Sequence, residues 1–266
     1  MKEKVNSEGK CKFCGKTFAK AGINRHLATH LKEKTMGSKS GNSFLVKVET
    51  CKRYGTTPYF LSLWIDGGST MKNLDDFLRD IWLECCGHMS AFIDPEIRNR
   101  RSGMFGMFGM MNKFEDEDED EDENEDDFDM DEFPGQIPMS KKAKDVLYKG
   151  KVLDYEYDFG STTKLTITVI EQYPMNANQK IDLLSRNESP KIVCTICGKA
   201  VATQICPYCC YGDMEAFCDK CAPKHTKDCE DFDDESSLPI VNSPRMGVCG
   251  YEGGVIDRER DRYVGI

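Results

Sequence analysis

The chain has 266 residues, of which 39% are hydrophobic and 31% are charged, and its formal net charge is −10. No run of about 18 apolar residues is present, which excludes a predicted transmembrane helix, and the start MKEKVNSEGK lacks the apolar region of a secretory signal. We therefore expect a cytoplasmic protein in a reducing compartment, where its fourteen cysteines more commonly bind metal than form disulfides.

Residues 1–36 form the first predicted domain, a zinc finger. Its pattern is Cys11-x2-Cys14-x11-His26-x3-His30, in which the two cysteines suit a turn and the two histidines lie one helical turn apart. This segment resembles the CCHH zinc finger family, with eleven residues between the Cys and His pairs instead of the usual twelve. The pattern predicts one tetrahedral zinc site.

The finger is also basic, because residues 1–40 contain ten Lys or Arg and three acidic residues. Such a charge attracts nucleic acid, DNA or RNA, although one finger contacts only about three base pairs. The residues predicted to make these contacts are Lys12, Lys16, Lys20, Asn24 and Arg25. A structural or protein-docking finger is the alternative.

Residues 43–190 carry strand and helix patterns of one α+β domain with a mostly antiparallel sheet. Alternating apolar residues predict strands at 44–50, 59–66, 89–94, 151–158 and 164–172. Helical spacing joins Leu74, Phe77, Leu78, Ile81 and Trp82. We expect Asn73 and Asp76 to form a variant capping box for this helix, and Ser140 to cap a short helix that runs to Leu147.

An insertion at 98–136 interrupts this domain with Met/Gly-rich and then acidic sequence. Residues 115–132 contain fifteen acidic side chains in eighteen positions, and without them the chain carries a net charge of +5. Such a segment cannot bury enough apolar surface to form a core, so we predict disorder. It is either a solvating loop or a decoy that competes with nucleic acid for the basic finger.

The central domain resembles the plasmid Orf-three-like (pRiA-type) family, whose members are often labelled insertion-element passenger proteins of TnpR type. The resemblance rests on Trp82, His88 and Phe92, and on the Tyr-Asp-Phe-Gly sequence at 157–160. It covers roughly residues 43–255 and implies the fold, whereas the family's activity is not established. After Gly160 many relatives continue with Asp, Trp and His, but this chain does not.

Residues 191–235 form a predicted Cys-rich module with two zinc sites, followed by an extended tail at 236–266. In a cross-brace, alternate ligand pairs share a metal. One site is then Cys194, Cys197, Cys218 and Cys221, and the other is Cys206, Cys209, His225 and Cys229. The module looks like the B-box and MYND class, and sequential pairing is the alternative.

Three zinc ions are therefore expected, each with four protein ligands and no open position for a substrate. The remaining cysteines are read as reduced thiols, with an additional site from Cys85, Cys86 and His88 as a weaker alternative. His88 is more simply a packed residue than a general base. We predict a non-enzymatic zinc protein that contacts nucleic acid, with no membrane partner. The alternatives are a protein-interaction adaptor and, with less support, an enzyme acting from the central domain.

Overall fold

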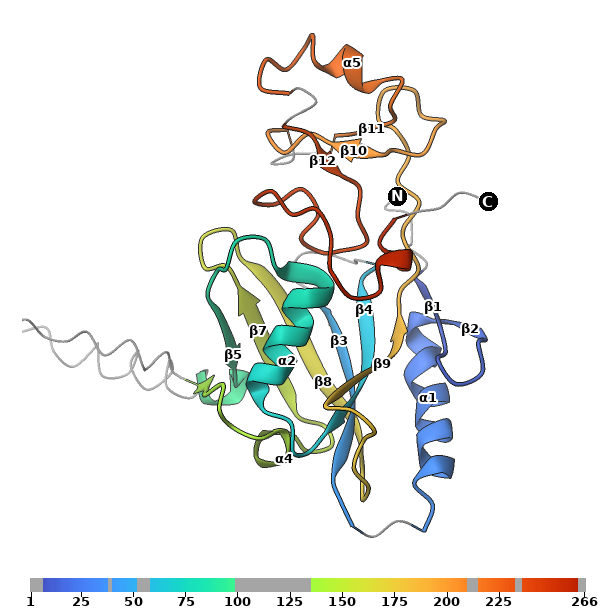
Figure 1. The fold of residues 1–266 in the computed structure, drawn as a ribbon, viewed down its shortest axis with the longest axis vertical. Coiled ribbons are helices and arrows are strands. Elements are labelled where there is room, and N and C mark those ends of the chain that lie inside the picture. The colour runs from blue at the N-terminus through green and yellow to red at the C-terminus, as the bar shows by residue number, and fades with distance from the viewer. Residues whose placement is uncertain are drawn as a thin grey trace, which may run out of the picture.

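The computed structural model describes residues 7–37, 40–51, 58–98, 135–209, 215–232 and 236–262 (Figure 1). The chain is an α+β protein built around one large antiparallel sheet. The acidic run predicted to be disordered, together with Lys2, Lys4 and Cys210, lies outside the described residues. Across the described ranges, no helix is both long and apolar enough to cross a membrane.

The sheet has seven strands in the order β6-β5-β7-β8-β3-β4-β9, and every neighbouring pair is antiparallel. The strands are β3 (Ser43–Thr50), β4 (Phe60–Asp66), β5 (Ser90–Ile93), β6 (Gln136–Ile137), β7 (Val152–Tyr157), β8 (Thr163–Tyr173) and β9 (Ile181–Arg186). Five of them match the predicted strands, and β7 and β8 show the expected alternation of buried and less buried residues. The edge strands β6 and β9 were not predicted.

The chain segment that connects β4 to β5 forms a helix, which covers one face of the sheet. It begins as α2 (Met71–Leu78) and continues as a π-helical turn, η2 (Arg79–Leu83). Its capping box is formed by Thr70 and Asn73, so the prediction of Asn73 and Asp76 is wrong by one turn. The short helix α4 (Ala143–Val146) has Lys142 and not Ser140 at its N-cap.

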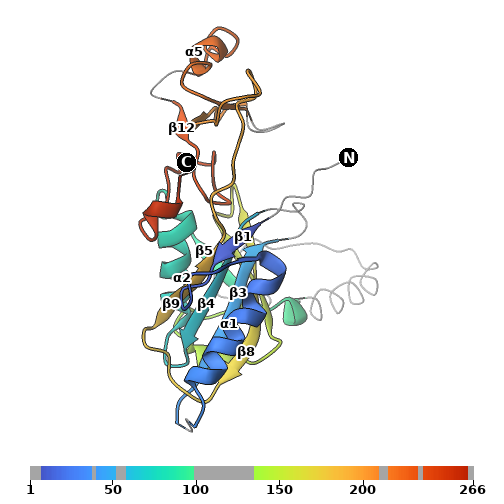
Figure 2. The same cartoon turned by 90° about the vertical axis from the view of Figure 1, so that its right-hand side faces the viewer.

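The N-terminal finger consists of β1 (Glu8–Lys10), β2 (Thr17–Ala19) and α1 (Lys20–Lys34). Its helix lies against the face of the sheet opposite to α2, as the two views together show (Figure 2). Ile23, Leu27 and Leu31 of α1 are fully buried. They pack in one cluster with Leu45, Phe60, Trp64 and Leu184 of the sheet. The finger therefore packs as a layer on the central sheet and shares a buried core with it.

Alternation along β3 explains why both faces are covered. Phe44, Val46 and Val48 belong to the apolar cluster that includes α2, whereas Leu45 belongs to the cluster that includes α1. Because successive side chains of a strand point to opposite faces, one strand supplies two cores. All three side chains and Leu45 are fully buried.

The C-terminal module lies beyond one end of the sheet and contains β10 (Gln204–Ile205), β11 (Ala216–Phe217), α5 (Ala222–His225) and β12 (Leu238–Pro239). The tail after it has little regular structure, with only a 3-10 turn, η3 (Arg258–Arg260), and packs on the central domain. The buried Arg186 of β9 donates to Asp261 and, over 2.6 Å, to the carbonyl oxygen of Asn242. The nitrogen of Val255 donates to the carbonyl oxygen of Asp80 in η2 over 2.6 Å.

Candidate metal centres

Cys and His side chains gather in four groups, and within each group the ligand atoms all lie within 4.8 Å of one another. Each group offers four soft or borderline ligand atoms, which is the donor set that suits zinc. The groups are Cys11, Cys14, His26 and His30; Cys194, Cys197, Cys218 and Cys221; Cys206, Cys209, His225 and Cys229; and Cys85, Cys86, His88 and Cys249. The sequence predicted the first three sets.

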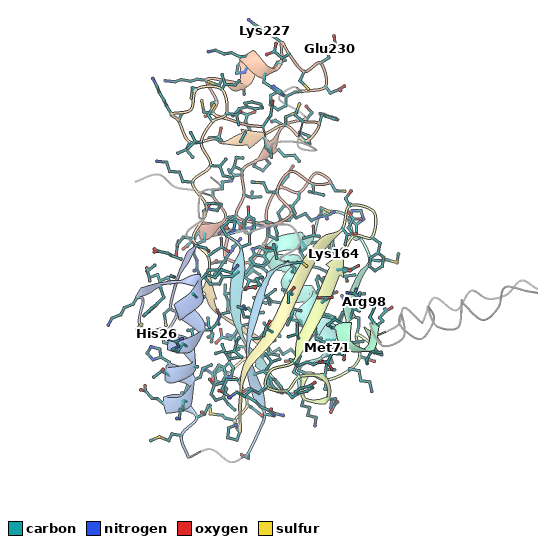
Figure 3. The ribbon with its side chains drawn as sticks, turned by 180° about the vertical axis from the view of Figure 1, so that it is seen from behind. His26, Met71, Arg98, Lys164, Lys227 and Glu230 are labelled. Atoms are coloured by element: carbon teal, nitrogen blue, oxygen red, sulfur yellow. The ribbon has the colours of Figure 1, made fainter. Side chains whose placement is uncertain are left out.

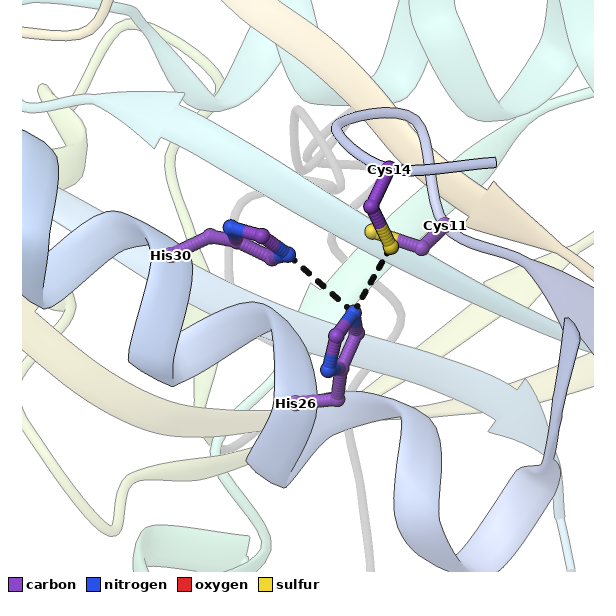
Figure 4. A group of neighbouring side chains, drawn as sticks. All are labelled: Cys11, Cys14, His26 and His30. Atoms are coloured by element: carbon purple, nitrogen blue, oxygen red, sulfur yellow. Dashed lines mark hydrogen bonds between the residues drawn. The ribbon is translucent and has the colours of Figure 1, made fainter. Parts of the chain in front are cut away.

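In the finger group, a hairpin turn and a helix bring the ligands together (Figure 4). Cys11 and Cys14 lie on the turn between β1 and β2, where Gly15 has a φ of +71° and donates to the carbonyl oxygen of Cys11. His26 lies on α1, with its Nε2 3.2 Å from both the Cys14 Sγ and the His30 Nε2. The four atoms therefore point at one position.

The surroundings of His26 favour the neutral imidazole, which is the form that binds metal. Burial lowers the pKa of His26, and the nearby His30 and Lys16 lower it further. Phe18 stacks on the ring, with 4.0 Å between the ring centroids, and fixes its orientation. These contacts prepare the site for a metal ion.

The two C-terminal groups use alternate ligand pairs, so the spatial arrangement is the cross-brace and not the sequential one. In the first group the backbone stabilises the thiolates of Cys194 and Cys197. Although burial raises the pKa of Cys194, backbone N–H groups of Cys197, Cys218 and Ile196 bring it down to about 6. Backbone N–H groups of Ala200 and Lys199 likewise lower the pKa of Cys197. Such donors are what a metal-binding thiolate needs.

In the second C-terminal group, His225 is held by its neighbours. Its Nε2 lies 3.6 Å from the Cys209 Sγ, while its Nδ1 lies 3.3 Å from a carboxylate oxygen of Glu215. Phe217 stacks on the ring, with 4.3 Å between the centroids. A carboxylate behind a metal-binding imidazole fixes its tautomer and increases its basicity.

The fourth group joins segments far apart in sequence. Cys85, Cys86 and His88 lie in the loop between η2 and β5, and Cys249 comes from the tail. These three cysteines are therefore close together in space, which adds a fourth possible site to the three expected, while their prediction as reduced thiols stays a prediction. The sequence Cys-Cys-x-His was a signal for three of the ligands, but nothing local indicates the fourth.

The five residues predicted to contact nucleic acid have different surroundings. Lys12 pairs with Asp182, and Asn24 is buried, where it accepts a hydrogen bond from the Ser62 hydroxyl over 2.8 Å. The Lys20 Nζ lies 3.7 Å from a carboxylate oxygen of Glu49. Lys16 and Arg25 are exposed. Docking of the finger on the sheet has thus occupied part of the predicted surface.

Comparisons with known proteins identify no family. No family model matches the chain, and no curated protein matches it. Among solved structures, a protein of unknown function, MM3350 from Methanosarcina mazei Go1, is similar at 13% identity with a TM-score of 0.34, covering 55% of this chain and 68% of that chain. This likeness carries no argument about function, and the resemblance to the Orf-three-like family stays a prediction.

Proposed function

We propose that this chain is a non-enzymatic binding protein scaffolded by zinc, which contacts the phosphate backbone of nucleic acid through the exposed side of its finger. The observation that carries the non-enzymatic part is the completeness of the ligand sets. Each predicted cluster supplies four protein ligands around one position, as in structural zinc sites. A complete set leaves no position for a substrate or a reactive water.

The basic side of the finger supports the choice of nucleic acid. Arg25, Thr29 and Lys32 follow one another at helical spacing along α1 and are all exposed. Lys10 and Lys16 are exposed on the adjoining strand and turn. Positively charged side chains in such a row attract phosphates and release counterions on binding.

The composition of the helix argues for binding without sequence specificity. In fingers that read DNA, the residues at positions −1, 3 and 6 of the helix contact bases. Here α1 begins at Lys20, so these positions are Ala19, Gly22 and Arg25. Only the arginine of the three can donate hydrogen bonds to a base edge.

Charge reversal tests this proposal without unfolding the finger. Binding of a labelled duplex and of a single-stranded RNA is measured against salt for the wild type and for the variant Lys16→Glu/Arg25→Glu/Lys32→Glu. The variant should bind more weakly, with the slope of log affinity against log salt reduced by about 3. The control reverses the exposed Lys141, Lys142 and Lys144, which adjoin α2 at Met71, away from His26 (Figure 3). Equal losses in both variants would refute a specific role of the finger.

An adaptor that binds protein is the second candidate, and a groove supports it. A cavity of about 950 Å³ lies between the turn at 161–164 and the C-terminal module, with Tyr59, Tyr208 and Leu238 in its wall. Recovery of a stoichiometric protein partner from nuclease-treated lysate, lost in Tyr208→Glu, would favour this candidate. The enzyme alternative has less support, because the ring of His88 points into a cluster of thiols.

A further inference from the structure

The loop at 85–88 and the tail meet in a group of side chains that none of the three predicted clusters includes. The Cys86 Sγ lies 3.8 Å from the Cys85 Sγ and 3.6 Å from the Cys249 Sγ. The His88 Nε2 lies 3.0 Å from the Cys86 Sγ and 3.2 Å from the Cys249 Sγ. Around a tetrahedral zinc ion, neighbouring sulfurs lie about 3.8 Å apart, and sulfur and nitrogen about 3.6 Å apart. The observed sulfur–sulfur distances are close to this arrangement, whereas the two sulfur–nitrogen distances are shorter than it requires, so a bound ion would move the imidazole slightly outward.

The charge around the group also suits a cation with three thiolates. Arg245 is fully buried, and its Nη2 donates to the Cys85 Sγ over 3.5 Å and to Asp158 over 2.6 Å. Three thiolates and a divalent ion carry one net negative charge, and Asp158 adds another; the guanidinium, which contacts both, offsets one of the two. A hydrogen bond from a fixed donor to a ligand sulfur is typical of the surroundings of metal sites.

The backbone of the tail is shaped to present Cys249. This residue has a φ of +52°, a left-handed conformation that non-glycine residues adopt rarely. It lies between Gly247 and Gly250, whose φ values are +77° and +67°. A tight turn of this kind directs the thiol toward the loop at 85–88, although Cys249 itself is exposed.

We propose that Cys85, Cys86, His88 and Cys249 form a fourth binding site for a soft divalent metal, zinc, which clamps the C-terminal tail to the central domain. The ligands from the two segments are 161 positions apart, from His88 to Cys249. The metal therefore closes a loop that contains β5 to β9 and the whole Cys-rich module. The inference does not depend on whether the finger binds nucleic acid.

Metal counting on the full chain, purified under reducing conditions, tests the proposal. The wild type should hold four zinc ions and Cys249→Ser should hold three. The matched control, Cys51→Ser, should hold four, because Cys51 belongs to none of the groups. After cobalt replacement, the charge-transfer absorption from thiolate should fall by a quarter in Cys249→Ser, since the site holds three of the twelve cluster cysteines. Three ions in the wild type, or four retained in Cys249→Ser, would overturn the proposal.

A measurement on the wild type alone covers the case in which the variant misfolds. Cys86 and Cys249 are exposed, so as free thiols they should be alkylated to the same extent with and without a chelator. If they bind metal, mass spectrometry will find them unlabelled before chelation and labelled after it. Labelling before chelation, or a Cys86–Cys249 disulfide in freshly reduced protein, would also overturn the proposal.

Discussion

Loss of the finger metal should loosen the central sheet, because α1 is one of its two covering layers. The perturbation is His30→Ala, which removes one ligand of the finger cluster while leaving the apolar side of the helix intact. Each fully buried Leu or Ile side chain stabilises the fold by roughly 1.5–3 kcal/mol. Undocking Ile23, Leu27 and Leu31 would therefore cost roughly 5–9 kcal/mol, which is comparable to the whole stability of a typical domain.

Trp64 reports on this docking directly. It is fully buried in the cluster with α1, and its Nε1 donates to the Ser43 hydroxyl over 2.9 Å. The other tryptophan, Trp82, has a buried Nε1 with no hydrogen-bond partner among the described residues, so Trp82→Phe gives a suitable single-tryptophan background.

In that background, His30→Ala should shift the emission of Trp64 to longer wavelength and lower the free energy of unfolding in urea by about 4 kcal/mol or more. Thr29→Ala, at an exposed position on the same helix, is the control and should change neither by much. An unchanged emission spectrum and an unchanged urea midpoint in His30→Ala would show that the finger folds or docks without its metal, contrary to this reasoning.

Three further predictions concern charged side chains and their partners. Burial raises the pKa of Asp75, but hydrogen bonds from Ser90, Lys72 and Tyr155 lower it overall, so the carboxylate stabilises the fold above about pH 4. Asp75→Asn should cost about 2–3 kcal/mol at pH 7 in urea unfolding, and the difference from wild type should shrink as the pH falls through the lowered pKa; Asp76→Asn, at an exposed position, should cost little. Arg186→Leu strands the buried Asp261 and should destabilise by about 3–5 kcal/mol with faster hydrogen exchange in the tail, whereas the exposed Arg258→Leu should not. Glu215→Gln should weaken zinc binding at the His225 site by about tenfold or more in chelator competition. An unchanged zinc affinity would contradict the orienting role of this carboxylate. Glu230→Gln, at an exposed position, is the control.

Local spacing explains what the sequence could predict. The finger ligands and the paired C-terminal ligands recur at intervals that a turn or one helical turn imposes, so the finger cluster and the C-terminal ligand pairs follow from the chain itself, whereas the choice between cross-brace and sequential pairing does not. The alternation in β7 and β8 likewise identifies half-buried strands. In β9, by contrast, the burial order has no period of two, because five of its six residues are buried and only one is partly exposed. Nothing in its sequence marks it as a strand.

Tertiary contacts decide the rest. The docking of α1 depends on Leu45, Phe60 and Trp64. The residues next to them in the strands point to the opposite face of the sheet, and no local sequence pattern indicates which helix covers which face. The fourth cluster requires Cys249 to meet a loop 161 positions earlier, counted from His88. Cysteines that are isolated in a sequence are usually free thiols. Only the folded arrangement shows that Cys249 lies with Cys85, Cys86 and His88.

The position of the finger in the chain has a consequence for synthesis on the ribosome. Much of the surface that covers α1, from Leu45 to Trp64, is translated directly after the helix, so a finger-and-hairpin unit can assemble early. Leu184 of the same cluster and Cys249 of the tail emerge much later. The nascent chain therefore carries an unpaired β4 edge until β9 arrives, and the tail packs on the domain only after that.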